Sequence, residues 1–210
     1  MPKIKAILFD MDGVLIDAKD WHYEALNQAL SLFGMEISRY DHLVTYDGLP
    51  TMKKLEMLSL ERGLPRALHN FINDMKQEFT FQLGYAKCKP NFNHQYALSI
   101  LKKQGYKLVS CSNSMRKTLD VLFERAHLTD YFEFYLSNED VKEPKPHPEI
   151  YLAAIDRLGF LPEECLVLED NEYGIKAAEL SGAHLLVVSN INEVNLENII
   201  NRILEIEKRI

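Results

Sequence analysis

The segment Asp10-Met11-Asp12-Gly13 places two carboxylates two residues apart, directly after a run of apolar side chains. Such a pair is costly through like-charge repulsion unless a cation or a reaction uses it. One interpretation makes Asp10 a nucleophile and Asp12 a neighbouring general acid and base, with Gly13 allowing the backbone to turn. The alternative is an ordinary aspartate turn with a helix cap, and an isolated pair would favour it.

A second acidic pair, Glu169-Asp170, follows another apolar run and precedes Gly174. Hard divalent cations such as Mg²⁺ take oxygen ligands in octahedral geometry and keep several waters, so two or three carboxylates and a phosphate oxygen suffice. The carboxylates of Asp10 and Asp170 and the backbone carbonyl of Asp12 fit that need. The two pairs together predict a magnesium site.

Two further polar segments offer groups that suit an anion. Ser112 and Asn113 precede a predicted helix, where a hydroxyl and backbone amides could bind a phosphate, although such a segment alone is typical of a helix cap. Lys145 lies among the three prolines of residues 144–148, which stiffen the backbone and hold the lysine in a defined place. The alternative for Lys145 is a solvated surface lysine.

Short apolar runs precede these segments and predict the strands that position them. Runs of helical period lie between the strands, and this alternation predicts an α/β fold: a doubly wound, Rossmann-like parallel sheet with helices on both faces. The carboxyl ends of parallel strands meet at one edge, so the fold would gather the four segments. The predicted strands are Ile4–Phe9, Lys107–Cys111, Phe134–Ser137, Cys165–Leu168 and His184–Val188.

Residues 18–85 break this alternation, since they carry helical patterns and no credible strand. We expect a helical cap domain there, inserted into a core of residues 1–17 and 86–210. Two helices are predicted to begin near Pro50 and Pro65, and three to end at Gly34, Gly63 and Gly84. A terminal helix is predicted over 196–210. The helical pattern at the start of this segment includes Ala25, Leu26, Ala29, Leu30 and Phe33.

Composition narrows the classes of function. Of 210 residues, 47% are hydrophobic and 26% charged, as in ordinary globular proteins, and the formal net charge is -7. No basic cluster suits a nucleic acid, and an anionic substrate would need a bound cation and a few placed lysines. The first residues are too short for a signal or a membrane span, so we expect a cytoplasmic protein. Three cysteines without paired spacing indicate buried hydrophobes rather than disulfides or zinc ligands.

The motifs resemble those of the haloacid dehalogenase superfamily, in its phosphatase and β-phosphoglucomutase-like branch with a helical cap inserted after the first strand. The resemblance spans essentially the whole chain and is specific because the motifs occur in the family's order. They are Asp10-Met-Asp-Gly-Val-Leu, Ser112-Asn113, Lys145-Pro-His-Pro-Glu-Ile-Tyr and Glu169-Asp170-Asn-Glu-Tyr-Gly174-Ile.

The resemblance implies a Mg²⁺-dependent phosphatase for a small phosphorylated metabolite. Asp10 would attack phosphorus and form an aspartyl-phosphate, while Asp12 would protonate the leaving oxygen and then activate water. Ser112 would hold a phosphate oxygen, with Asn113 beside it, and Lys145 would neutralise charge between Asp10 and the phosphate. The implied metal ligands are Asp10, the Asp12 carbonyl and Asp170, with Glu169 assisting directly or through water.

The cap segment 46–54 resembles the family's substrate-reading loop, which makes Gly48 and Lys53 candidate substrate contacts together with His22. Thr51 stands where β-phosphoglucomutase carries an arginine, and a bidentate guanidinium suits a mutase that must hold a second phosphate. Hydrolysis is therefore favoured over a sugar-phosphate mutase, which stays open because Lys53 or Lys54 could supply a charge. A dehalogenase is less favoured, and a catalytically silent binding module is a third alternative. A monomer is favoured, although the sequence does not determine the oligomeric state.

Two positions depart from the family pattern. Asn91 follows the proline after the cap, where the family often has glycine, and asparagine tolerates the same left-handed backbone angles. Asn171 replaces the usual serine after the acidic pair, and we expect it to retain the loop because it keeps the polarity.

Overall fold

The computed structural model describes residues 4–46 and 49–208. Two compact units divide the chain: a core unit, residues 1–17 with 88–210, and a helical unit, residues 18–87. The prediction had placed the second boundary after residue 85, and the helix that crosses that point continues to Lys87. Each unit is described by itself below.

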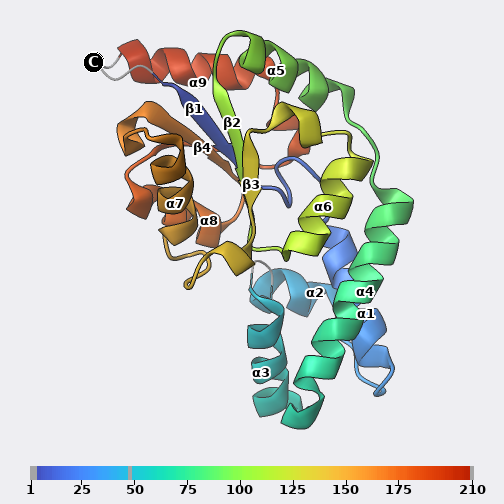
Figure 1. Cartoon of the computed structure of the whole chain (residues 1–210). Coiled ribbons are helices and arrows are strands. Elements are labelled where there is room, and N and C mark those ends of the chain that lie inside the picture. The colour runs from blue at the N-terminus through green and yellow to red at the C-terminus, as the bar shows by residue number, and fades with distance from the viewer. Residues whose placement is uncertain (1–3, 47–48, 209–210) are drawn as a thin grey trace. The chain divides into compact units, whose positions relative to one another are not determined.

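Within the described residues, the core unit is built on a five-stranded parallel sheet in the order β3-β2-β1-β4-β5 (Figure 1). This confirms the predicted α/β fold. The first strand in sequence lies at the centre, as in doubly wound folds, so helical crossovers run to both sides of it. The strands are β1 (Ala6–Phe9), β2 (Lys107–Cys111), β3 (Phe134–Leu136), β4 (Cys165–Glu169) and β5 (His184–Val187).

Helices cover both faces of this sheet. Residues of α7 and α8 join alternate residues of the strands, such as Leu8 and Val109, in one apolar cluster, because side chains alternate between the faces of a strand. On the other face α5 and α9 pack together (Figure 1). All three cysteines are buried, as predicted. The core helices are α5 (Phe92–Lys103), α6 (Arg116–Arg125), α7 (Glu149–Leu158), α8 (Glu172–Ser181) and α9 (Leu196–Lys208).

The helical unit has its own apolar cluster, which includes Leu26, Leu30, Leu55 and Ile72. Its longest helices, α1 and α4, pack along each other. Short 3₁₀ helices complete the described chain at Arg66–Leu68, Thr129–Tyr131, Asn138–Asp140, Pro162–Glu164 and Ile191–Glu193. No described helix in either unit is long and apolar enough to span a membrane. The helices of the unit are α1 (Lys19–Ser31), α2 (Arg39–Asp41), a π-helix (His42–Tyr46), α3 (Thr51–Arg62) and α4 (His69–Lys87).

Two local predictions in the helical unit are wrong. Gly84 does not end a helix: it is buried inside α4, and glycine in a helix interior is tolerated where packing favours it. The predicted helical pattern extends too far at Phe33, because α1 ends at Ser31 and Phe33 is 37% exposed. Gly63 does cap α3, with a φ of 72°.

Candidate active site

The register of the sheet brings the predicted segments to one edge. Phe9, the last residue of β1, pairs with Ser110 of β2 and with Leu168 of β4. The next residue, Asp10, donates its backbone N–H to the Leu168 carbonyl at 3.0 Å. The candidate nucleophile therefore lies beside the end of β4, where the second acidic pair begins.

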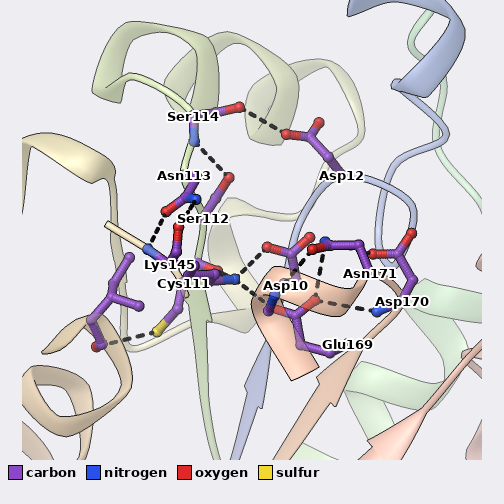
Figure 2. A network of polar contacts seen from close by, with 12 residues as sticks. Asp10, Asp12, Cys111, Ser112, Asn113, Ser114, Lys145, Glu169, Asp170 and Asn171 are labelled. Carbon is purple, nitrogen blue, oxygen red and sulfur yellow. Dashed lines mark hydrogen bonds and ion pairs between the residues drawn. The ribbon is translucent and has the colours of Figure 1, made fainter. Parts of the chain in front are cut away.

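The loop after β1 is tight and directs the two aspartates differently. The Met11 carbonyl accepts the N–H groups of Leu15 and Ile16 at 2.9 Å each. Gly13 adopts a φ of 90°, which few other residues could adopt. The Asp12 carboxylate accepts a hydrogen bond of 2.7 Å from the hydroxyl of Ser114. In the view of Figure 2 this contact lies above Asp10.

Lys145 places a positively charged ammonium group in the site. Only 3% of the residue is exposed, and its ammonium donates to Asp10 Oδ1 at 2.6 Å, to Glu169 Oε1 at 2.6 Å and to the Cys111 carbonyl at 2.8 Å. Burial lowers the pKa of Lys145, but Asp10 and Glu169 outweigh it and hold that pKa above its usual value. The ammonium is therefore a fixed positive charge against Asp10, and a solvated surface lysine is excluded.

The Asp10 carboxyl is in an environment that disfavours its charge. Burial first, and then the Glu169 carboxylate, raise the pKa of Asp10 well above its usual value, against the lowering effect of Lys145. The carboxylates of Asp12 and Asp170 raise it further. A further cation at this point would favour the ionised form.

Asp10, Glu169 and Asp170 each offer a carboxylate oxygen, and these oxygens lie within 4.8 Å of one another. Carboxylate oxygens are the ligands that hard divalent cations prefer, and the excess negative charge invites one. The residues present therefore fit a Mg²⁺ ion, although the kind of metal stays a prediction.

Glu169 is completely buried at the end of β4, against the first turn of α8. A Cβ added to Gly174 would lie 2.0 Å from the Glu169 carboxyl carbon, so only glycine allows the helix to come this close. Asn171 caps the same helix, because its Oδ1 accepts the Gly174 N–H at 3.0 Å. Its Nδ2 donates to Asp170 Oδ1 at 3.2 Å and to Glu169 Oε2 at 3.4 Å. Asn171 thus retains the loop, as expected, and also contacts both carboxylates of the pair.

The two predicted phosphate-binding residues, Ser112 and Asn113, have different hydrogen-bond partners. Ser112 is buried at the end of β2, and its Oγ accepts the Ser114 N–H at 3.0 Å. The Asn113 side chain forms two hydrogen bonds with the Lys145 backbone, accepting its N–H at 3.0 Å and donating to its carbonyl at 3.2 Å. Asn113 therefore ties Lys145 in place, and its contact with substrate stays a prediction.

The candidate substrate residues of the cap lie in the helical unit. The Lys53 ammonium is exposed on α3 and lies 3.4 Å from Glu56. On α1, His22 Nδ1 lies 3.3 Å from the Lys76 ammonium, a contact that the sequence did not predict. Gly48 lies outside the described residues. The roles of Gly48, Lys53 and His22 in substrate binding stay predictions.

Sequence reasoning missed two residues that contact the site. Ser114, which holds Asp12, was only a neighbour of the predicted phosphate-binding pair. Tyr151 is the last residue of the Lys145 motif and had no assigned role in the site, yet its hydroxyl donates to Glu169 Oε1 at 2.5 Å. Burial first, and then Glu169, raise the pKa of Tyr151 well above its usual value, so the hydroxyl stays a donor. Its place six residues after Lys145 was the available signal.

Comparison with known proteins agrees with this geometry. A phosphorylated carbohydrates phosphatase of Thermotoga maritima is 31% identical over 196 residues, which cover 90% of this chain and 88% of that protein. A phosphoglycolate phosphatase of Aquifex aeolicus is 28% identical over 179 residues, covering 85% and 82%. The crystal structure of β-phosphoglucomutase from Clostridium difficile matches with a TM-score of 0.82 over 98% of this chain and all of that one. At 23% identity, this likeness shows the fold alone.

The family model described as haloacid dehalogenase-like hydrolase matches residues 7–188, a range that includes both acidic pairs, Ser112 and Lys145. The predicted family is thereby confirmed, and this chain belongs to the haloacid dehalogenase-like hydrolases.

Proposed function

We propose that this chain is a Mg²⁺-dependent phosphatase that hydrolyses a small phosphorylated metabolite through an aspartyl-phosphate on Asp10. The observation that carries the proposal is the buried Lys145 ammonium, held between Asp10 and Glu169 beside a cluster of three carboxylates. Membership of the hydrolase family confirms the predicted enzyme class, and the two named relatives are phosphatases.

In the first half-reaction the Asp10 carboxylate attacks phosphorus, and the bond between phosphorus and the ester oxygen breaks. Asp12 gives its proton to the leaving oxygen, so the alcohol departs neutral. Lys145 favours the ionised form of Asp10 and offsets the charge that accumulates on the phosphoryl oxygens. Ser112 donates its hydroxyl to one of these oxygens.

In the second half-reaction Asp12, now a carboxylate, takes a proton from water. The water oxygen bonds to phosphorus, the bond between Asp10 and phosphorus breaks, and inorganic phosphate leaves. The proposed ligands of Mg²⁺ are Asp10, Asp170 and the Asp12 carbonyl, with Glu169 assisting. When bound, the ion supplies positive charge for Asp10 and the phosphate oxygens.

Hydrolysis is preferred to phosphate transfer within a sugar phosphate for two reasons. Thr51, at the start of α3, offers no guanidinium for a second phosphate. The named sequence relatives are phosphatases, whereas the mutase is a relative in fold. A mutase would isomerise a hexose phosphate without releasing phosphate, so an assay of released phosphate separates the two.

The test is a screen of phosphorylated metabolites with Mg²⁺, scored by released phosphate, on the wild type and on Asp10→Asn. We expect the wild type to turn over at least one substrate and Asp10→Asn to release none with its fold intact. Wild-type protein stopped during turnover of a ³²P-labelled substrate should retain label in an alkali-labile bond. The matched control is Asp130→Asn, an exposed aspartate of the core unit that should keep wild-type activity.

Two results would contradict the proposal. Phosphate release by Asp10→Asn at the wild-type rate would show that Asp10 is not the nucleophile. Metal binding by the wild type without turnover across the whole panel would favour a silent binding module.

A further inference from the structure

Tyr151 lies on α7 with none of its surface exposed, and it contacts both charged partners of the buried ion pair. Its hydroxyl donates to Glu169 Oε1 at 2.5 Å. The Lys145 ammonium lies 4.8 Å from the centre of its ring, within the range of a cation–π interaction. One side chain thus contacts the cation through its π face and the anion through its hydroxyl.

The hydroxyl completes a set of hydrogen bonds around Glu169. Oε1 accepts from Tyr151 and Lys145, and Oε2 accepts from the Asp170 N–H at 3.2 Å and from Asn171 at 3.4 Å. Each oxygen therefore accepts two hydrogen bonds, which is the usual capacity of a carboxylate. This arrangement fixes the direction of the Glu169 carboxylate.

The ring in turn confines Lys145. All three ammonium hydrogens are directed to oxygens, namely those of Asp10, Cys111 and Glu169. The Tyr151 ring packs beside the ammonium. An ammonium is otherwise a mobile group on a flexible stem, so this packing helps to hold it against Asp10.

Packing alone does not explain a tyrosine at this position. The neighbours of Tyr151 on the buried face of α7, Ile150, Ala154 and Ile155, are apolar. A phenylalanine would fill nearly the same volume without burying a hydroxyl, which costs free energy unless it is hydrogen-bonded. The hydroxyl is therefore explained by its bond to Glu169.

We propose that Tyr151 is a positioning residue, whose hydroxyl fixes Glu169 and whose ring confines Lys145, so that Asp10, Glu169 and Asp170 keep the spacing that binds a divalent cation. The proposal rests on the proposed function only for the presence of that cation. It holds whether or not the chain hydrolyses a phosphate ester.

The test uses Tyr151→Phe, which keeps the ring and removes the hydroxyl. Mn²⁺ affinity, measured without substrate by electron paramagnetic resonance, should fall about tenfold or more, as is usual when the partner of a metal-site carboxylate is removed. With a substrate, kcat should fall while KM changes less than about threefold, because the hydroxyl orients catalytic groups and does not touch the substrate. Tyr135→Phe is the matched control, since it removes a hydroxyl bonded to Asp120 on the surface and should leave both values unchanged.

A double-mutant cycle with Glu169→Gln tests whether the hydroxyl acts through Glu169. Tyr151→Phe should lower Mn²⁺ affinity in both backgrounds, but by a factor that is at least about threefold smaller in Glu169→Gln than in the wild type. The reason is that the bond to the introduced glutamine is no longer charge-assisted. An equal effect in both backgrounds, or Mn²⁺ affinity of Tyr151→Phe within twofold of wild type, would overturn the proposal.

Two further measurements allow the result to be interpreted if the variant folds poorly or if the wild type does not hydrolyse a substrate. If Tyr151→Phe folds poorly, affinity per folded molecule is measured from the fraction that retains wild-type near-UV circular dichroism, and a wild-type value there also overturns the proposal. A wild type that binds Mn²⁺ but hydrolyses nothing would remove the proposed function, and the Mn²⁺ comparison would still decide the role of Tyr151.

Discussion

At the residue scale, the site depends on side chains that hold other side chains. Asn113 is the clearest case, because both ends of its amide bond the backbone of Lys145. Ser114 holds Asp12 with one hydrogen bond from its hydroxyl to the carboxylate. Partners of this kind place the groups that they bond, and small displacements of such groups cost large factors in rate.

We expect Asn113→Ala to lower kcat about tenfold or more, because the Lys145 backbone loses two hydrogen bonds and its ammonium is less well placed. The free energy of unfolding should fall by about 1–3 kcal/mol, the cost of leaving partly buried polar groups unpaired. Urea denaturation and steady-state kinetics measure the two effects. The control is Asn198→Ala, which removes an exposed side chain-to-backbone bond far from these residues in sequence. Unchanged kcat in Asn113→Ala would contradict this role.

At the scale of elements, the site requires a strand and a helix to meet closely. The carboxylate at the end of β4 lies against the first turn of α8, and Gly174 is the residue that permits it. Helix α5 also contributes a buried contact between elements, because its His94 bonds the backbone of two loops of the core unit.

Gly174→Ala should abolish Mn²⁺ binding, because its methyl group would overlap the Glu169 carboxylate and either the helix or the carboxylate must move. Isothermal calorimetry measures the affinity. Gly159→Ala is the comparison, since its added methyl meets open space and only its φ of 70° is strained. That variant should lose about 1 kcal/mol of stability and keep Mn²⁺ affinity. Equal Mn²⁺ affinities in the two variants would refute the argument from close approach.

His94 is buried on α5, with Nδ1 3.1 Å from the Leu15 carbonyl and Nε2 2.7 Å from the Ile191 carbonyl. Burial lowers its pKa from the ordinary value of 6.5, although the two carbonyls oppose this. The unfolded chain therefore binds a proton at higher pH than the folded one, and stability must fall as pH decreases through the ordinary value.

We expect the free energy of unfolding to decrease between about pH 7 and pH 5, and His94→Gln to reduce that dependence. Urea denaturation at a series of pH values measures it. His127→Asn is the control, because His127 is exposed and asparagine tolerates its φ of 53°. The same pH dependence in His94→Gln and wild type would exclude His94 as its source.

At the scale of the whole molecule, the chain is acidic, and its buried carboxylates concentrate negative charge at the edge of one sheet. Folding must bring these charges together, which opposes the folded state. The Lys145 ammonium offsets part of this cost, and removing one partner of a buried ion pair costs about 3–5 kcal/mol.

Mg²⁺ should therefore stabilise the folded chain. At about one hundred times its dissociation constant, the added free energy of unfolding should be about 2.7 kcal/mol, because the ion binds the folded state. Differential scanning calorimetry with Mg²⁺ or with EDTA measures this shift. Asp170→Asn should lose most of it, and an equal shift in Asp170→Asn and wild type would show that the ion binds elsewhere.

The sequence determined the fold class and the strand ends. Apolar runs and helical periods are local properties, so they located β1 to β5 within about two residues. Local signals were weaker in the helical unit, where Gly84 and Phe33 were predicted wrongly because packing decides where a helix ends.

The types of the candidate site residues were also in the sequence, since Asp10 and Asp170 each follow a recognisable strand and Lys145 lies among prolines. The contacts that hold these side chains in place come from the packing of distant segments. Ser114 meets Asp12 across 102 residues of chain, and Lys145 meets Asp10 across 135. Hydrogen bonds between such distant residues depend on how helices pack on the sheet, and no local pattern encodes that distance. The packing of α7 on the sheet likewise brings the Tyr151 hydroxyl to Glu169.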